Sequence, residues 1–276
     1  MKHGRIALAA GVVAAALISG PAFGQLIVGN DQSGTATIYN LDVNTGAATP
    51  IYSSSTAEAK PWGMAYDVST NTLYWNNGGT LYKSAFGPTL VPETLGQMTF
   101  NNANVNFVAL GFLNGKLYGT RNITTEAVYS IDVATLQATQ EYVYPSAFDF
   151  GGLDADFTNG RLYGLTDANT PGLYEFDLGG QTQSFKAPYP AGETDIDGLA
   201  VHDGLAYYVT DGPNTAQANF YVYNVASGQL VRTLPSPFTG SGTFSAATYI
   251  VPEPATAGVM ALVAGLLVGT RRRHSA

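Results

Sequence analysis

A tyrosine that returns at nearly constant intervals limits the fold of this chain more than any other feature. The first series is spaced by 44 to 45 residues and comprises Tyr74, Tyr118, Tyr163 and Tyr207. A second series keeps a similar interval and comprises Tyr39, Tyr82, Tyr129, Tyr174 and Tyr221. A period of roughly 40–45 residues with several turns in each unit is typical of propeller blades built from four strands. A solenoid or a plain sandwich of two sheets explains this constancy less well.

Residues 152–177 show the repeated unit clearly. Three short stretches, 153–157, 161–166 and 173–177, predict strands. Asn159-Gly160 separates the first two, and this dipeptide is a strong signal for a hairpin because both residues tolerate positive φ. We expect the repeated tyrosines to pack between neighbouring blades, with their hydroxyl groups left for polar partners; a platform for ligand stacking is the alternative.

The two ends of the repeat region complete each other. The first unit, which begins at Leu26, lacks an innermost strand, and residues 243–250 look like an innermost strand without followers. Pairing these segments would complete one blade and close the ring, which removes exposed sheet edges. The sequence therefore predicts an all-β propeller of about five four-stranded blades.

Charge and cysteine content exclude several classes of function. The 276 residues include 12 Lys and Arg, 20 Asp and Glu, and no Cys. Residues 25–251 contain 7 of the basic and 19 of the acidic side chains, a net charge of −12. This balance argues against nucleic acid, whose binding depends on Lys and Arg contacts to phosphate, and is compatible with cations. The lack of Cys rules out disulfides, thiol nucleophiles and Cys-ligated metals.

The first 24 residues predict an export signal with a helical core. Lys2 and Arg5 precede an apolar run over 6–18, and Ala22-Phe23-Gly24 supplies the small residues that signal peptidase requires. We expect cleavage before Gln25 and a propeller domain over 25–251. A buried N-terminal helix or an uncleaved anchor is the alternative.

The other end of the chain carries three features in order. Pro252-Glu253-Pro254 precedes an apolar segment over 255–270, and Arg271, Arg272 and Arg273 follow it. A helix over that segment spans roughly 24 Å, which is short for a bilayer but feasible with local thinning. The arginines would stay in the cytoplasm and place the propeller on the far side of the membrane.

The order of these features over 251–276 resembles the PEP-CTERM sorting signal of exported proteins. The resemblance implies a Gram-negative bacterium that makes exopolysaccharide, and processing by an exosortase, which is a membrane protease. It also implies transient anchoring in the inner membrane, followed by residence at the cell surface or in the extracellular matrix. An ordinary tail anchor is the alternative, and in both cases residues 252–276 serve targeting.

Common catalytic motifs are absent from the sequence. It contains no G-x-S-x-G elbow, H-E-x-x-H pair, P-loop or EF-hand loop. His202 is the only histidine between 25 and 251 and lies beside the Asp203-Gly204 turn, so we expect a solvated side chain.

Acidic and amide side chains precede the innermost strands. Asp149 and Asp195 have equivalent places in successive blades, and Asn106 has that place one blade earlier. Asp154 and Asp197 lie close by in sequence. We expect a binding site that is ringed, at one mouth of the central channel, by Asn106, Asp149, Asp195 and Asp197. Three chemistries are open: capping of local turns, a cation site such as Ca²⁺, or the paired acids of a glycosidase.

A second polar set follows the second strand of each blade and comprises Asp31, Asn76, Arg121, Asp167 and Asp211. We expect this set at the opposite end of the strands from Asp149 and Asp195, so that one site cannot readily use both sets. Turn formation is the favoured account of the second set.

The favoured hypothesis is an exported, non-catalytic propeller at the cell surface or in the exopolysaccharide matrix of a biofilm, which binds polysaccharide, protein or cations through its loops. It requires no cofactor, and Ca²⁺ stays an open option. The alternative is an extracytoplasmic hydrolase or lyase that acts on sugars through carboxylates such as Asp149 and Asp195. A lactonase-like hydrolase with Ca²⁺ at the same place is a weaker third hypothesis.

Overall fold

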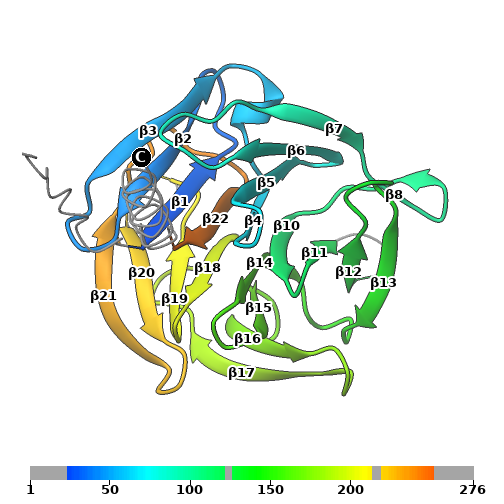
Figure 1. Ribbon diagram of the computed structural model, residues 1–276. Coiled ribbons are helices and arrows are strands. Elements are labelled where there is room, and N and C mark those ends of the chain that lie inside the picture. Colours follow the sequence, from blue (N-terminus) through cyan, green and yellow to red (C-terminus); the bar gives the residue numbers. More distant parts are fainter. Residues whose placement is uncertain (1–23, 122–125, 213–218, 252–276) are drawn as a thin grey trace, which may run out of the picture. The chain divides into compact units, whose positions relative to one another are not determined.

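The computed structural model describes residues 24–121, 126–212 and 219–251, which contain 22 strands and one short 3₁₀ helix. Five antiparallel sheets of four strands are arranged around one axis like the blades of a propeller (Figure 1). The predicted all-β propeller with five blades is thereby confirmed.

The blades are numbered along the chain, and the strands of each blade are named from the innermost to the outermost. Blade 1 comprises β22 (Ser245–Ile250), β1 (Gln25–Asn30), β2 (Ala36–Asp42) and β3 (Ala48–Ser54). Blade 2 comprises β4 (Gly63–Asp67), β5 (Thr72–Asn77), β6 (Thr80–Ala85) and β7 (Glu93–Gln97). Blade 3 comprises β10 (Ala109–Leu113), β11 (Lys116–Arg121), β12 (Ala127–Ile131) and β13 (Ala138–Val143).

Blade 4 comprises β14 (Phe150–Asp156), β15 (Arg161–Thr166), β16 (Gly172–Asp177) and β17 (Thr182–Pro188). Blade 5 comprises β18 (Gly198–His202), β19 (Leu205–Val209), β20 (Asn219–Asn224) and β21 (Gln229–Pro235). The helix η1 (Ala57–Ala59) lies between blades 1 and 2, and the small hairpin of β8 (Thr99–Phe100) and β9 (Ala103–Asn104) lies between blades 2 and 3.

Strands from both ends of the domain close the ring in blade 1, as the sequence predicts. β22 pairs with β1 in antiparallel register, with Gln25 opposite Ile250 and Asn30 opposite Ser245. Both strands are almost wholly buried, because β22 is an innermost strand between blades 5 and 2. Without this pairing, each of the two strands would have an exposed edge.

The hydrophobic core lies between the blades. Each of five clusters of buried side chains joins two neighbouring sheets, and together they pass once around the ring. The repeated second-strand tyrosines belong to these clusters, with exposed fractions from 2% at Tyr207 to 8% at Tyr74. The prediction that they pack between blades is confirmed, and each fully buried side chain of this size contributes roughly 1.5–3 kcal/mol.

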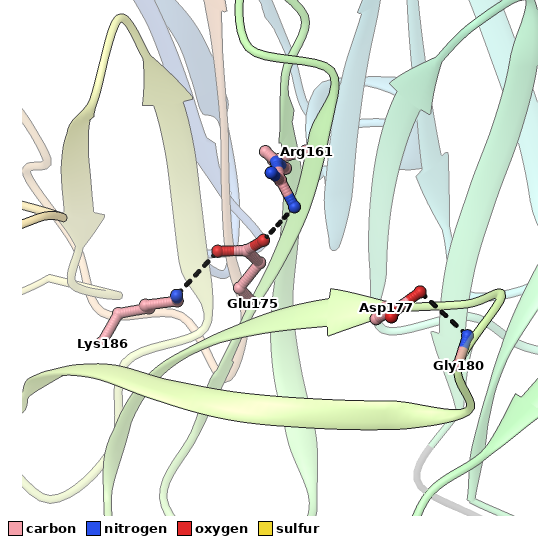
Figure 2. A network of polar contacts seen from close by, with 5 residues as sticks. All are labelled: Arg161, Glu175, Asp177, Gly180 and Lys186. Carbon is pink, nitrogen blue, oxygen red and sulfur yellow. Dashed lines mark hydrogen bonds and ion pairs between the residues drawn. The ribbon is translucent and has the colours of Figure 1, made fainter.

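Aspartates cap the turns that leave the first or third strands. The Asp42 carboxylate accepts hydrogen bonds from the backbone N–H groups of Asn44 and Thr45 at 2.8 and 3.2 Å. Asp177 accepts one from Gly180 at 2.9 Å (Figure 2). Such Asx turns satisfy amides that the strands leave unpaired, which explains why Asp recurs at these positions.

The two mouths of the central channel differ in what they present. We call the end at which the innermost strands begin the upper mouth and the end at which they finish the lower mouth. Thr243 and Phe244 precede β22 at the upper mouth, whereas Gly24 and Val251 flank the paired residues Gln25 and Ile250 at the lower mouth. The chain therefore enters and leaves the propeller at its lower mouth.

Residues 24–251 form one compact unit. The predicted signal peptide over 1–24 lies outside the described residues except for Gly24, and the predicted sorting signal over 252–276 lies wholly outside them. The signal, the sorting helix and the domain boundaries therefore stay predictions. No helix in the part of the chain that the structure describes is long and apolar enough to cross a membrane.

Candidate functional site

A cavity of about 230 Å³ opens at the upper mouth, beside blades 4, 5 and 1. Side chains before the innermost strands line it, and they are joined by Asp167 after β15 and Tyr189 after β17. The complete lining comprises Asp149, Gly151, Asp167, Tyr189, Asp195, Asp197, Thr243 and Phe244. Three of the four predicted site residues, Asp149, Asp195 and Asp197, are thus brought together.

Asp167 corrects the expected separation of the two polar sets. The expectation placed the end of the second strand far from the start of the first. In an antiparallel pair those two points are adjacent, and Phe150 at the start of β14 lies opposite Thr166 at the end of β15. The second polar set therefore lies at the same mouth as the first, and Asp167 shares the cavity with Asp149 and Asp195.

Other members of the second set serve the structure, as the turn account predicts. Asp31 Oδ1 accepts hydrogen bonds from the backbone N–H groups of Thr243 and Phe244 at 2.6 and 3.0 Å. The Asn76 amide donates to the carbonyl groups of Gly78 and Phe107, both at 2.7 Å. These contacts fix the loops of the upper mouth, including the Thr243–Phe244 segment that lines the acidic cavity.

The carboxylates of the cavity are not used in this way. Among the described residues, no hydrogen bond reaches the carboxylate oxygens of Asp149, Asp167, Asp195 or Asp197, and Asp149 Oδ1 is buried without a partner. The turn-capping account, which holds for Asp42 and Asp177, therefore does not explain these four side chains. Their oxygens are available to a ligand.

Burial and mutual repulsion raise the pKa values of three of these carboxyl groups. Burial is the largest cause at Asp149 and Asp195, and the charge of Asp167 adds to it at both. The Asp197 pKa lies well above its usual value, through burial first and then the charges of Asp195 and other nearby aspartates. Burial and nearby like charges both disfavour the ionised form, so a ligand with positive charge or hydrogen-bond donors would be favoured here.

Glycine lets the backbone approach the Asp197 carboxylate. A Cβ atom at Gly151 on β14 would collide with Asp197 Oδ1, and one at Gly152 would lie 2.7 Å from the Asp197 carbonyl oxygen. The glycine pair therefore permits blades 4 and 5 to meet closely at the floor of the cavity. The sequence shows the glycine pair Gly151-Gly152 after Asp149. It does not show that the pair lies against Asp197.

Aromatic rings flank the carboxylates. Phe244 lines the cavity, and its ring centroid lies 4.4 Å from that of Trp62, in the loop before β4, with the planes tilted by 33°. Both side chains are partly exposed. Tyr189 donates its hydroxyl to the Ile196 carbonyl at 3.0 Å and so presents mainly its ring. Trp62 and Phe244 belong to no repeated position, so the sequence pattern did not mark them as site residues.

Asn106 lies on the aromatic side of the upper mouth. It is exposed and does not line the acidic cavity. A Cβ atom at Gly78 would lie 3.3 Å from the Trp62 ring and 3.5 Å from Asn106 Cγ, which places the two side chains close to each other. The role proposed for Asn106 in binding stays a prediction.

The described residues contain no preformed metal site. Within the described residues, no group of three or more His, Asp and Glu side chains is close enough to hold one. Ca²⁺ normally takes six to eight oxygen ligands, with several from carboxylates. The acidic cavity is therefore better suited to hydrogen-bond donors or organic cations than to a site built for a metal.

His202 lies at the lower mouth, and the expectation of a solvated side chain is wrong. Its ring stacks between those of Tyr249 and Phe157, with centroids 4.4 and 5.3 Å away. Burial lowers the His202 pKa, which favours the neutral form of the ring. The side chain packs between blades rather than serving the acidic cavity, because neighbouring blades supply aromatic rings that the local turn sequence does not reveal.

Comparisons with known proteins support the fold alone. No family model and no curated protein matches the sequence. A solved structure of a nidogen–laminin complex contains a chain with a TM-score of 0.53 and 14% identity, covering 82% of this chain and 98% of that one. TolB from Acinetobacter baumannii gives a TM-score of 0.52 and 13% identity, covering 83% of this chain and 67% of that one. The chain is similar to these proteins in fold.

Proposed function

We propose that this protein is an exported, non-catalytic propeller that binds its ligand at the acidic upper mouth. The observation that carries the proposal is the set of four carboxylates without hydrogen-bond partners around one cavity. Aspartates elsewhere in the same chain, such as Asp42, Asp132 and Asp177, cap turns with their oxygens, and these four do not. Binding needs such unused groups, since a site whose polar atoms are already paired offers a ligand little.

The chemistry of the cavity suits a polysaccharide or a basic segment of a protein. Carboxylates accept hydrogen bonds from sugar hydroxyls or from ammonium groups, and charged acceptors make the stronger bonds. The exposed face of Phe244 or Trp62 would stack on a sugar ring or on an organic cation. Cations are a third class of ligand, although the described residues lack a preformed metal site.

The path of the chain supports display of this mouth. Gly24 and Val251 lie at the lower mouth, so any segment that continues past Val251 leaves from the face opposite the acidic cavity. In this proposal the PEP-CTERM-like tail is cut by an exosortase, and the propeller then resides at the cell surface or in the exopolysaccharide matrix.

A thermal-shift screen of the purified protein against neutral glycans, amino-sugar oligomers, a lysine-rich peptide and CaCl₂ tests this proposal. A ligand specific for the native state raises the melting temperature by mass action. We expect Asp149→Asn with Asp195→Asn to abolish the shift, because the change removes two charges with little change in shape. Asp203→Asn is the matched control, since Asp203 is exposed in a lower-mouth turn. Equal shifts in the wild type and the double variant would refute the assignment of ligand binding to the upper mouth.

A sugar-cleaving enzyme is the second candidate, and one observation favours it. Asp149 and Asp195 line one cavity, and burial raises both pKa values, which is the direction that a general acid requires. Release of reducing ends from polysaccharides by the wild type, lost in Asp195→Asn, would establish this function. Ligand binding without any turnover would support the non-catalytic proposal.

A further inference from the structure

A second hollow lies on the lower, outer side of the molecule between blades 4 and 5, away from the acidic cavity. It has a volume of about 440 Å³, within the range of small-molecule sites. Polar side chains of blade 4 form one wall, and the turns that contain Gly204 and Val225–Ala226 of blade 5 form the other. We call it the interblade groove; its polar lining comprises Asn159, Arg161, Tyr163, Glu175 and Lys186.

Two cations are held in the groove by one carboxylate. Glu175 Oε1 accepts a hydrogen bond from Arg161 Nη1 at 2.7 Å, and Glu175 Oε2 lies 2.8 Å from Lys186 Nζ (Figure 2). The Glu175 side chain is only 16% exposed, so it is a fixed anchor for both partners. Lys186 is the extra residue of a β-bulge between β16 and β17, and such bulges re-aim side chains.

Most donors of these side chains stay unused. Arg161 commits one of its five N–H groups to Glu175, and its side chain is 58% exposed. Lys186 has three N–H donors and one close acceptor. The Tyr163 hydroxyl has no hydrogen-bond partner among the described residues, and burial raises its pKa to about 12, so it keeps its proton. The groove therefore presents several oriented donors.

The local charge differs from that of the rest of the protein. Arg161 and Lys186 are two of only 7 basic residues between 25 and 251. Asp156 is a further carboxylate near Tyr163, but it is buried and accepts hydrogen bonds from the N–H groups of Thr158, Asn159 and Gly204. Its charge is thus compensated by backbone donors, and the exposed charge of the groove is that of the two cations and Glu175.

Blade 3 shows that this arrangement is not a property of every blade. Its Lys116 and Glu141 occupy the places of Arg161 and Lys186, and Ser130 stands where blade 4 has Glu175. Lys116 Nζ lies 3.9 Å from Glu141, a loose exposed pair that carries no net charge. Blade 3 therefore lacks the double cation of blade 4, and Lys116 supplies an internal control.

We propose that the interblade groove binds a sugar acid, with the carboxylate of a uronate unit on Arg161 and Lys186 and its hydroxyl groups on Tyr163, Asn159 and Glu175. Arginine presents a planar fork that matches a carboxylate, and Glu175 holds the fork in place before the ligand arrives. A neutral sugar would leave the cations without a charged acceptor beyond Glu175, and a simple anion would leave the hydroxyl partners unused. The site is separate from the acidic cavity, so either one can fail without the other.

Titration of the full protein with trigalacturonate, followed by calorimetry, tests the proposal. We expect binding that Arg161→Gln weakens about tenfold or more, which corresponds to the loss of one charge-assisted hydrogen bond. Arg161→Lys keeps the charge but not the planar fork, so its affinity for trigalacturonate should lie between those of the wild type and Arg161→Gln. Lys116→Gln should bind like the wild type, and maltotriose, the neutral comparison, should not bind.

Three results would overturn the proposal. They are equal affinity in the wild type and Arg161→Gln, equal weakening by Lys116→Gln, and inorganic phosphate binding as tightly as trigalacturonate. The first places the ligand elsewhere, the second shows a general effect of charge, and the third shows an unselective anion site. Near-UV circular dichroism confirms that each variant is folded before its affinity is compared.

Discussion

The buried carboxyl group of Asp154 should make the propeller less stable as pH rises, and Asp154→Asn should remove that dependence. Asp154 lies on the innermost strand β14 and is 3% exposed. Its Oδ2 accepts a hydrogen bond from the Val201 N–H of β18 at 2.8 Å, and the Thr248 hydroxyl of β22 donates to Oδ1 at 3.4 Å. One side chain thus joins the innermost strands of three blades.

The sign of the effect follows from the pKa. Burial raises the Asp154 pKa well above its usual value, and the hydrogen bond from Val201 opposes the shift only in part. Below the unfolded pKa of about 3.9 both states carry the proton, and stability is unaffected. Above that value the unfolded chain ionises while the folded one does not, so stability falls by up to about 1.4 kcal/mol per pH unit until the folded group ionises.

Asparagine at this position keeps the geometry and removes the titration. Its carbonyl oxygen can accept the Val201 N–H, and its amide can face the Thr248 hydroxyl. We therefore expect Asp154→Asn to gain on the wild type as pH rises from about 4, at up to about 1.4 kcal/mol per pH unit. Asp154→Ala should instead lose about 1–3 kcal/mol at low pH, because the buried N–H of Val201 is left unpaired.

Urea unfolding at intervals from about pH 4 to about pH 8, followed by tyrosine and tryptophan fluorescence, measures these differences. Asp132→Asn is a control of opposite sign, because hydrogen bonds from Ala134 and Thr135 lower the Asp132 pKa. Its stabilising effect is fully present above the unfolded pKa of about 3.9 and is lost only as pH falls below that value, so Asp132→Asn should differ from the wild type by a constant amount between about pH 4 and about pH 8. Parallel curves for the wild type and Asp154→Asn would refute the account of Asp154.

Two further predictions concern the closing strand and the acidic cavity. Ser245→Ala should destabilise the protein by about 1–3 kcal/mol in urea unfolding. The reason is that Ser245 Oγ accepts a buried hydrogen bond from the Gly198 N–H at 2.9 Å and donates one to the Val209 carbonyl at 2.6 Å. Unchanged stability would contradict this role of Ser245. Burial and then the charges of Asp149 and Asp167 raise the Glu126 pKa to about 7. Asp149→Asn should therefore lower the Glu126 pKa, which carboxyl chemical shifts measure. An unchanged Glu126 pKa would show that Glu126 and Asp149 do not interact.

Local turn chemistry was predictable because it depends on neighbours in the sequence. Asp followed by a turn stretch forms Asx turns at Asp42 and Asp177, and Asn159-Gly160 joins β14 to β15. The same reasoning favoured turn roles for the second polar set and kept them as one of three options for the first, and at Asp149 and Asp167 it does not hold. Short-range patterns describe what a side chain can reach in its own loop, and they do not include what another blade brings near it.

The sequence by itself determined the blade. The tyrosine period, the alternation of strands and turns, and the complementary ends were enough for five four-stranded sheets closed by β22. These features are local or periodic, so they can be recognised in the sequence without knowing which blades become neighbours. Only the tertiary structure decided which charges meet. Antiparallel pairing brought Asp167 to Asp149, the ring brought Asp195 beside them, and a bulge turned Lys186 toward Glu175. Electrostatic interaction depends on distance through space, and residues from separate blades become neighbours only when the ring has closed.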